Sequence, residues 1–423
     1  MNEYDSEIAR TILLKNAFSI ASKPEEASVI LLNTCSVREN AHRKVMQRLS
    51  ELQNLRSANH DLIIGVIGCM AQSMKGKLIE DGTGVDIIAG PDTYRRLPEL
   101  IRRFETSGEK ESDLILSRTE TYSDVFPVHD QSVNAWIAVM RGCNNACSFC
   151  IVPYARGRER SRSPQNVVDE ARQIAEQGFK QITLLGQNVN SYTYGKADFA
   201  DLINRVSDVD GISRIRFTSP HPKDFPLKLI DVVRDNPKAC KHIHLPLQAG
   251  NDRILELMRR TYTQSEYLRL AHLIKTEMPD ITITTDIIVG FPSETEEEFL
   301  DTLHVVKEVG FDAAFMFKYS ERENTLASRK YPDDVPEEAK TSRITRLVDL
   351  QRKISLEKNT SHVGEIFEVL VEGPAKKPYQ SLGRNDGNKI VVFPNGRVNP
   401  GDFVNVRINE ATPNTLIGEL IAT

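Results

Sequence analysis

Short apolar runs alternate with longer amphipathic segments along the first hundred residues of the chain. The apolar runs lie at residues 27–33 (ASVILLN), 61–67 and 85–89, and helical patterns lie at 6–21 and 39–55. Continuous apolar runs of this length are typical of strands that are buried on both faces of a parallel sheet. The pattern predicts a small α/β domain over residues 1–125, and the polar, aperiodic stretch at 107–130 is predicted to be the linker.

A second pattern begins at residue 134 and contains six strand-like runs separated by helical segments. The runs are WIAVM, QITLLGQ, SRIRFTS, HIHLPLQ, ITITTDIIVG and FDAAFMFKYS. Six strand–helix units predict a partial TIM-like barrel, open on one side, over residues 130–357. Because alternate strand residues share a face, one predicted face is polar; it carries Arg214, Arg216, Thr218, His242, His244, Gln248, Thr282, Thr284 and Asp286. A polar lumen indicates a cavity that holds a charged ligand.

The last part of the chain, residues 358–423, has the pattern of a small β-barrel. Strand-like runs at 363–372, 390–393, 402–409 and 416–421 are separated by Gly-Pro, Asn-Asp-Gly, Pro-Asn-Gly and Asn-Pro-Gly turns. About 60 residues of short strands are typical of an OB-like barrel. The predicted fold class is therefore α/β, with a parallel α/β domain, a partial (βα)6 barrel and a C-terminal β-barrel.

Composition adds limits to this picture. The chain has 423 residues, 40% of them hydrophobic, and a net charge of −5, so any attraction to nucleic acid must be local. No apolar run reaches the roughly 20 residues that a membrane span needs, and no signal-peptide pattern opens the chain. We expect a cytoplasmic monomer with no membrane partner.

Three of the six cysteines lie together in RGCNNACSFC, at positions 143, 147 and 150. They follow the first barrel strand, at the end where TIM-type barrels carry their chemistry. A structural zinc site needs four ligands, and no further Cys or His lies near. The spacing instead favours an iron–sulfur cluster with three thiolate ligands and one iron open to a small molecule.

With its surroundings, this loop resembles the radical S-adenosylmethionine (SAM) methylthiotransferases, most closely the MiaB branch that modifies tRNA. The resemblance extends over RGCNNACSFCIVPYARGRERSR, LGQNVNSY, LPLQAGNDRILELMRR and TTDIIVGFPSETEEEF. It implies a 4Fe–4S cluster on Cys143, Cys147 and Cys150, whose open iron binds SAM for reductive cleavage to a 5′-deoxyadenosyl radical. It further implies methylthiolation of carbon 2 of N6-isopentenyladenosine beside the anticodon, with a tRNA anticodon stem-loop as partner and a reducing donor such as flavodoxin.

Two more cysteines, Cys35 and Cys69, each follow a predicted strand of the N-terminal domain. The carboxyl ends of neighbouring parallel strands form one ligand-binding edge, and the family resemblance implies a second, auxiliary 4Fe–4S cluster there. The family has a third cysteine in a Gly-Cys-Gln segment, and this sequence opens at Met1 just after that point. We expect a misassigned start or a fragment, with the auxiliary cluster held incompletely. Cys240 matches no family ligand and is predicted to be a structural thiol.

Further site residues are predicted from their positions. Gln187, Asn188, Gln248 and Asp286 are expected to contact SAM because they face the lumen. Arg156, Arg158, Arg160 and Arg162, directly after the cysteines, are expected to contact RNA phosphates. The C-terminal barrel resembles the TRAM domain, in which a local basic patch is expected from Lys376, Lys377, Arg384 and Lys389.

Two other classes of function stay open at this point. One is a sister methylthiotransferase that acts on threonylcarbamoyladenosine in tRNA or, like the RimO type, on a ribosomal protein. The RimO cluster loop lacks the Arg-rich RGRERSR form found here. The other is an inactive, truncated iron–sulfur protein that binds RNA.

Overall fold

The computed structural model describes residues 1–35, 39–74, 77–80, 83–129 and 133–421, which form two compact units. The first unit comprises residues 1–130, 140–162 and 322–325, and the second comprises 131–139, 163–321 and 326–423. The loop with the three clustered cysteines thus belongs to the first unit, although its flanking strand belongs to the second. The three-domain boundaries read from the sequence stay a prediction.

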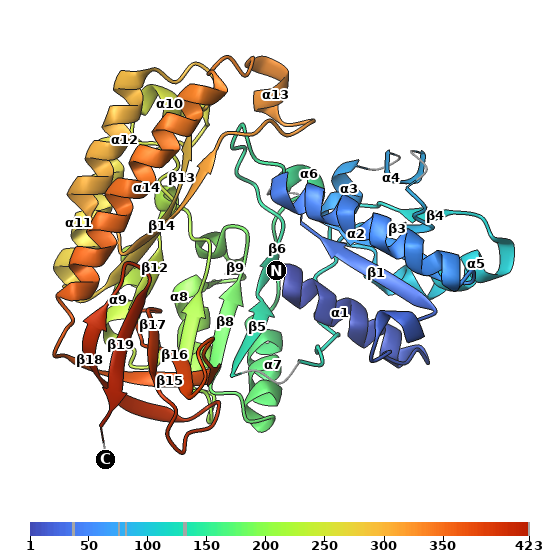
Figure 1. Cartoon of the computed structure of the whole chain (residues 1–423), viewed down its shortest axis with the longest axis horizontal. Helices are drawn as coiled ribbons and strands as arrows, with labels where there is room; N and C mark the ends of the chain where they lie inside the picture. Colours follow the sequence, from blue (N-terminus) through green and yellow to red (C-terminus); the bar gives the residue numbers. More distant parts are fainter. Residues whose placement is uncertain (36–38, 75–76, 81–82, 130–132, 422–423) are drawn as a thin grey trace. The chain divides into compact units, whose positions relative to one another are not determined.

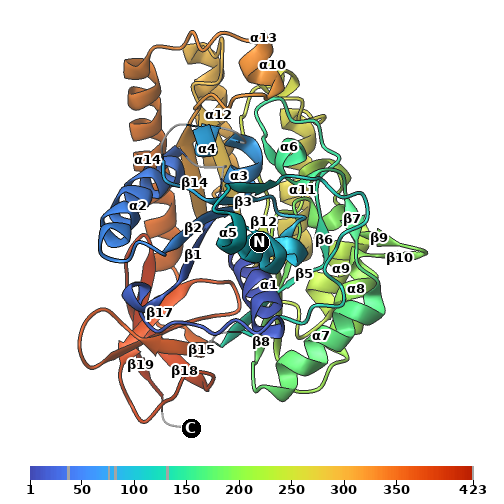
Figure 2. The same ribbon diagram turned by 90° about the vertical axis from the view of Figure 1, so that its right-hand side faces the viewer.

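The first unit contains a parallel sheet with the strand order β1-β2-β3-β4 (Figure 1). Its strands are β1 Val29–Thr34, β2 Ile63–Gly68, β3 Ile87–Ala89 and β4 Glu111–Asp113, and its helices include α1 Asn2–Lys15, α2 Glu39–Ala58, α3 Cys69–Met74, α4 Lys77–Glu80 and α5 Leu97–Ser107. Leu49 and Leu52 of α2 pack on Ile64 and Val66 of the sheet. Helices α1 and α5 lie side by side (Figure 2). The predicted parallel α/β domain is confirmed.

The stretch predicted as a linker is part of this unit. Strand β4 extends the sheet, and Tyr122 is fully buried. The Tyr122 hydroxyl accepts from the Tyr94 N–H at 3.0 Å and donates to the carbonyl of Pro91 at 3.1 Å. The prediction of a linker was therefore wrong. A few buried side chains such as Tyr122 fix this segment, and isolated buried residues give no periodic pattern in the sequence.

The second unit contains six parallel strands in two sheets, β11-β8-β5 and β12-β13-β14, which are linked by the bridge between Ile215 and Ala239. The strands are β5 Asn134–Ala138, β8 Gln181–Leu185, β11 Arg214–Phe217, β12 His242–His244, β13 Thr282–Val289 and β14 Ala313–Lys318. The helices are α7 Pro164–Glu176, α8 Phe199–Ser207, α9 Leu227–Asp235, α10 Asp252–Leu257, α11 Gln264–Glu277, α12 Glu296–Val309, α13 Leu326–Lys330 and α14 Glu337–Thr360. Ile243, Leu245 and Leu247 are fully buried, as the alternation predicts. The partial barrel is confirmed.

A closed β-barrel follows α14, with the strand order β15-β16-β17-β19-β18. Its strands are β15 Ile366–Pro374, β16 Gln380–Arg384, β17 Ile390–Pro394, β18 Phe403–Ala411 and β19 Thr415–Leu420. The sequence predicts four of these and misses β16, whose Gln-Ser-Leu-Gly-Arg sequence has a single large apolar side chain. Val369, Val391, Val406 and Leu416 are among the residues that form its core.

The β16–β17 loop of this small barrel, residues 385–389, docks at the amino ends of the larger barrel's strands (Figure 1). The Arg216 guanidinium donates to the carbonyls of Asn385 and Asp386 at 2.7 and 2.8 Å. A Cβ on Gly387 would lie 2.3 Å from Thr282 Oγ1, so the loop backbone fits closely. We call this contact the barrel floor. Here Arg216 holds protein carbonyls instead of the charged ligand expected from a polar lumen.

Ionic contacts strengthen the floor. Lys389 Nζ lies 2.8 Å from Asp312 Oδ1, and Lys358 Nζ lies 2.7 Å from Asp312 Oδ2. Burial raises the pKa of Asp312, but these two ammonium groups outweigh it, so the pKa lies below its ordinary value. Arg214 donates to the carbonyls of Arg384 and Glu368 at 2.8 and 2.9 Å.

Candidate iron–sulfur and SAM site

The loop with the clustered cysteines, residues 142–159, is closed at its base by a short antiparallel pair. Strand β6 (Met140–Arg141) pairs with β7 (Arg160–Ser161), so the chain leaves and returns at one point. Within the loop, the Cys143 N–H donates to the carbonyl of Gly157 and the Cys150 N–H to that of Cys147, each at 3.1 Å. Gly142 has φ of 79°, and a Cβ there would lie 2.0 Å from the Arg158 carbonyl oxygen, so only glycine fits.

The thiols of Cys143, Cys147 and Cys150 are partly exposed and form no disulfide. Three thiols on one loop suit an iron–sulfur cluster by their chemistry. However, the described residues include no group of three or more Cys, His, Asp or Glu side chains gathered closely enough to hold a metal ion. The donor set fits a cluster, and the ligand geometry would form as the cluster binds.

Three of the four arginines predicted to contact RNA have partners inside the protein. Arg156 binds Asp5, Arg160 lies 3.0 Å from Asp92, and Arg162 Nη1 donates to the Tyr4 hydroxyl at 3.0 Å. All three arginines are at least 93% buried, whereas Arg158 is exposed. Of the four, Arg158 is the one whose position leaves it open to a phosphate.

Asp5 is the centre of this ionic network. It is fully buried and binds both Arg156 and Arg141, whose Nη2 lies 2.7 Å from Oδ1. Burial raises the pKa of Asp5, but the two guanidiniums outweigh it, so the pKa lies below its ordinary value. Sequence reasoning missed both Asp5 and Asp92, because isolated acids in polar surroundings give no signal of burial.

Cys35 and Cys69 lie where the sequence predicts them. Cys35 directly follows β1 and Cys69 directly follows β2, and these strands are neighbours in the sheet. Cys69 is buried, and Arg156 Nε donates to its Sγ at 3.1 Å. Burial raises the pKa of the Cys69 thiol, and the Arg156 guanidinium opposes this shift. Their role as ligands of a second cluster stays a prediction.

Cys240 is buried beneath β11, and its backbone N–H donates to the carbonyl of Ile215 at 3.0 Å. Burial raises the pKa of its thiol to about 12, so the thiol is neutral near pH 7. These surroundings are those of the structural thiol that the sequence predicts.

In the second unit, Gln187 and Asn188 follow β8 after one glycine, Gly186. The Gln187 side-chain amide and the Asn188 Oδ1 atom are buried and have no hydrogen-bond partner in the described structure. Buried amides of this kind are costly unless a ligand or water satisfies them. They therefore fit the polar groups of a ligand such as SAM.

Gln248 and Asp286, the other two predicted SAM contacts, lie beside each other. The Gln248 N–H donates to the Asp286 carbonyl at 2.8 Å, and Gln248 has a left-handed φ of 69°. Asp286 Oδ2 lies 3.2 Å from His244 Nε2, and His244 Nδ1 lies 3.0 Å from Thr284 Oγ1. Sequence alternation had placed these polar groups on one face, and the contacts agree.

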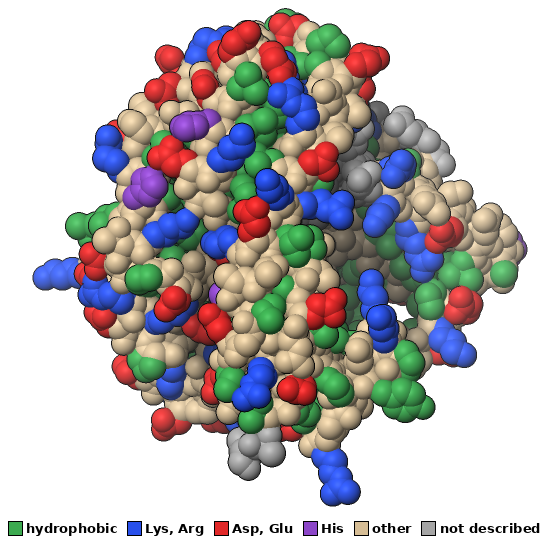
Figure 3. All heavy atoms as spheres, turned by 60° about the vertical axis from the view of Figure 1, so that its left-hand side comes forward, with side chains coloured by type: hydrophobic (Ala, Val, Ile, Leu, Met, Phe, Trp, Pro, Cys, Tyr) green, Lys and Arg blue, Asp and Glu red, His purple; other side chains and the backbone are tan. Residues whose placement is uncertain are grey.

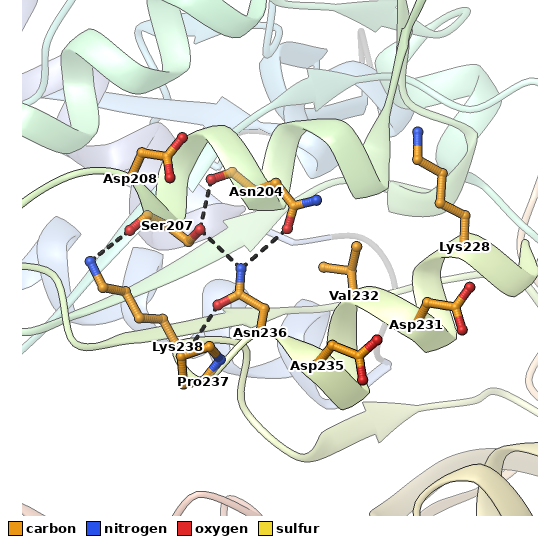
Figure 4. A pocket seen from close by; sticks show the side chains of 10 residues that line it. All are labelled: Asn204, Ser207, Asp208, Lys228, Asp231, Val232, Asp235, Asn236, Pro237 and Lys238. Carbon is orange, nitrogen blue, oxygen red and sulfur yellow. Dashed lines mark hydrogen bonds between the residues drawn. The ribbon is translucent and has the colours of Figure 1, made fainter.

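A surface cavity of about 550 Å³ lies between α8 and α9 (Figure 4). Asn236 Nδ2 donates to Ser207 Oγ at 2.9 Å, and Lys238 Nζ donates to the Ser207 carbonyl at 2.6 Å. None of the predicted site residues lines this cavity. This cavity is therefore not part of the candidate site.

Together, the partial parallel barrel, the three-cysteine loop and the C-terminal barrel define a radical SAM enzyme with a TRAM domain. The family model of the radical SAM superfamily matches residues 137–306, and that of the TRAM domain matches 360–421. Residues 1–90 match an uncharacterised protein family, UPF0004. A radical SAM enzyme implies a bound iron–sulfur cluster and SAM.

Curated relatives show which family of radical SAM enzymes this chain is similar to. A tRNA-2-methylthio-N(6)-dimethylallyladenosine synthase from Chloroherpeton thalassium is 46% identical over 100% of this chain and 94% of its own length. The proteins of that name from Bacteroides fragilis and Porphyromonas gingivalis are 46% and 45% identical, over 99% and 100% of this chain and 93% of their own lengths. The chain belongs to the tRNA-2-methylthio-N(6)-dimethylallyladenosine synthase family.

Solved structures agree on the fold. The radical SAM methyltransferase TsrM from Kitasatospora setae, with cobalamin and a 4Fe–4S cluster bound, superposes with a TM-score of 0.58 at 15% identity. The match covers 90% of this chain and 77% of TsrM. Among the helices of the described residues, none is long and apolar enough to cross a membrane.

Proposed function

We propose that this chain transfers a methylthio group to carbon 2 of N6-isopentenyladenosine beside the anticodon of tRNA. The observation that carries the proposal is the similarity to synthases of that name over the whole chain, which includes the three-cysteine loop. That loop is held by a closed base and a glycine that accepts no side chain.

Cys143, Cys147 and Cys150 would hold the 4Fe–4S cluster to which SAM binds, and the buried amides of Gln187 and Asn188 would satisfy polar groups of SAM. When bound, the cluster and SAM supply one-electron chemistry. An aromatic C–H bond of adenine is too strong and too weakly acidic for ordinary acid–base catalysis, so the cofactor carries the hard step while the protein orients the base. A base in an unpaired anticodon loop can be splayed out to reach such a site.

A second 4Fe–4S cluster, held incompletely by Cys35 and Cys69, belongs to this proposal. We also propose a monomer that works in the cytoplasm and receives electrons from a donor such as flavodoxin. The exposed Arg158 is proposed to contact tRNA phosphate.

The test uses the anaerobically reconstituted protein with SAM, a reductant, inorganic sulfide as the sulfur source, and tRNA that carries or lacks the isopentenyl group. Mass spectrometry of the digested nucleosides is expected to show the methylthio product only from isopentenylated tRNA. The variant with Cys143, Cys147 and Cys150 changed to Ala is expected to form no 5′-deoxyadenosine, whereas Cys240→Ala, which alters a buried thiol that belongs to no predicted ligand set, retains it.

Modification of threonylcarbamoyladenosine tRNA or of a ribosomal protein, with none on isopentenylated tRNA, would reject the proposal. Reductive SAM cleavage by the triple variant would reject the assignment of the cluster ligands.

A further inference from the structure

The last strand of the partial barrel, β14, lies at its open edge. Among the described strands β14 pairs only with β13, in parallel, and this register sets Phe315 opposite Asp286. Register partners in a parallel ladder point to the same face of the sheet, and so do alternate residues of one strand. Phe315 and Phe317 therefore share the lumen face with Asp286, whereas Lys318, on the other face, pairs with Glu337 of α14.

Phe315 is an aromatic side chain that is 53% exposed although it lies on a strand. Its ring meets the ring of His244 edge to face, with the two centroids 5.9 Å apart. His244 is itself fixed through both ring nitrogens, because Nδ1 lies 3.0 Å from Thr284 Oγ1 and Nε2 lies 3.2 Å from Asp286 Oδ2. The phenyl ring is thus held against a fixed imidazole, and about half of its surface stays open to a ligand.

Asp286 adds a hydrogen-bond acceptor beside this ring. Asp286 and Phe315 are register partners, and neighbouring strands lie about 4.8 Å apart. The Asp286 side chain is 31% exposed and uses Oδ2 for His244, which leaves Oδ1 as an acceptor for a ligand. The open edge therefore presents an apolar ring and a carboxylate oxygen about one strand spacing apart.

The base proposed as the substrate carries the complementary pair of groups. In N6-isopentenyladenosine the exocyclic nitrogen bears one N–H and a branched, apolar chain. Unmodified adenosine has a second N–H in place of the chain, and threonylcarbamoyladenosine has a polar chain that ends in a carboxylate. A phenyl ring beside a carboxylate fits the first of these bases. It loses the apolar contact with the second and opposes the charge of the third.

Contacts to phosphates cannot make this distinction, because every tRNA carries the same phosphates. On the face drawn in Figure 3, Lys and Arg side chains are interspersed with Asp and Glu. The basic patch expected in the C-terminal barrel is wrong, since Arg384 lies 3.0 Å from Glu372 and Lys389 lies 2.8 Å from Asp312. Selection of the modified base must come from side chains that touch the base itself.

We propose that Phe315 selects the isopentenyl group of the substrate and that Asp286 accepts a hydrogen bond from the N6–H of the same base. The phenyl ring packs on the chain, and the carboxylate holds the base in place of the SAM contact expected for Asp286. This proposal rests on the proposed function, since it names the side chains that recognise the substrate of that reaction.

The experiment measures binding of a fluorescent anticodon stem-loop, with and without the isopentenyl group, to the full-length reconstituted protein. The parent is expected to bind the isopentenylated stem-loop more tightly. Phe315→Ala is expected to reduce this preference about tenfold, the effect of losing an apolar contact with a few carbons, whereas Phe315→Leu stays within about threefold of the parent. Leu227→Ala, which alters a 65% exposed apolar residue on α9, is the matched control and leaves both affinities unchanged.

Asp286→Asn separates the two roles. Both stem-loops carry an N6–H, so the loss of the charged acceptor is expected to weaken the binding of both by about tenfold and to leave the preference as it is. A loss confined to the isopentenylated stem-loop would contradict the role given to Asp286.

Equal affinity of the parent for the two stem-loops, or an undiminished preference in Phe315→Ala, would overturn the proposal. Because Phe315 is more than half exposed, its variants are expected to keep the unfolding midpoint of the parent. Phe315→Gln, which keeps much of the volume but not the apolar surface, repeats the test if Phe315→Ala unfolds early. If the parent methylthiolates isopentenylated tRNA while Phe315→Ala keeps the full preference, the role of Phe315 is rejected and the proposed function stands. Failure of the parent to modify that tRNA rejects the proposed function instead.

Discussion

Arg156 donates a hydrogen bond from Nε to the Sγ atom of Cys69 at 3.1 Å, and the same guanidinium binds the carboxylate of Asp5. The loop with the three clustered cysteines is thereby fastened to a predicted ligand of the second cluster and to helix α1. Arginine suits this position because its planar fork serves two partners at once.

Asp5→Asn is expected to leave Arg156 buried without a counter-charge, and Arg141 with only Asp92, whose Oδ1 lies 3.9 Å from Arg141 Nε. Breaking a buried pair in this way typically costs about 3–5 kcal/mol, so the urea midpoint of the first unit should fall clearly. Glu3→Gln, an exposed acid on the same helix, is the control and should change the midpoint little. Equal midpoints for Asp5→Asn and the parent would show that the network contributes no stability.

A second prediction concerns the stability of the barrel floor. Gly387→Ala places a Cβ about 2.3 Å from Thr282 Oγ1, so the docked loop must shift, at a cost of roughly 1–3 kcal/mol in unfolding free energy. Thr282→Ala removes that oxygen, and the double variant should lose less stability than the sum of the two single changes. Strict additivity in this cycle would contradict the close fit of the loop.

The elements with strong periodicity could be predicted from the sequence, as could the positions of Cys35 and Cys69 after neighbouring strands. The burial of the arginines could not. RGRERSR has the composition of a solvated loop. The carboxylates that pair with the buried Arg156 and Arg160 lie 151 and 68 residues away in the sequence. The floor contact was also invisible, because Arg216 binds backbone carbonyls, which every sequence carries. Contacts of this kind depend on tertiary structure and leave no local pattern.

Two histidines of the second unit predict how its stability changes with pH. Burial lowers the pKa of His221 and of His242 to about 3 in each case, so both stay neutral in the folded state. In the unfolded chain the pKa of each histidine is about 6.5. The contribution of the two histidines to the free energy of unfolding is therefore complete above that pH. As the pH falls toward 3 this contribution is lost, by up to about 1.4 kcal/mol per pH unit for each histidine.

Urea unfolding of the second unit at pH 7.5, 6.5 and 5.5 measures this slope. His242→Gln should flatten the decline, whereas His272→Gln, at an exposed position on α11, should leave it as it is. If the free energy of unfolding falls equally steeply with pH in His242→Gln and in the parent, protonation of His242 does not destabilise the fold.

The exposed Arg158 and the buried Arg160 predict opposite phenotypes from the same substitution. Arg158→Gln removes a cation whose side chain is open to RNA, so it should lower the salt slope of tRNA binding by about one and leave unfolding unchanged. Arg160→Gln instead strands Asp92 without its partner at 3.0 Å, and should lower the unfolding free energy by about 3 kcal/mol. Fluorescence binding titrations and urea unfolding, run on both variants, separate the two effects. If Arg158→Gln bound tRNA with the parent's affinity and slope while Arg160→Gln altered the slope in a fully folded protein, the division between exposed and buried arginines would be wrong.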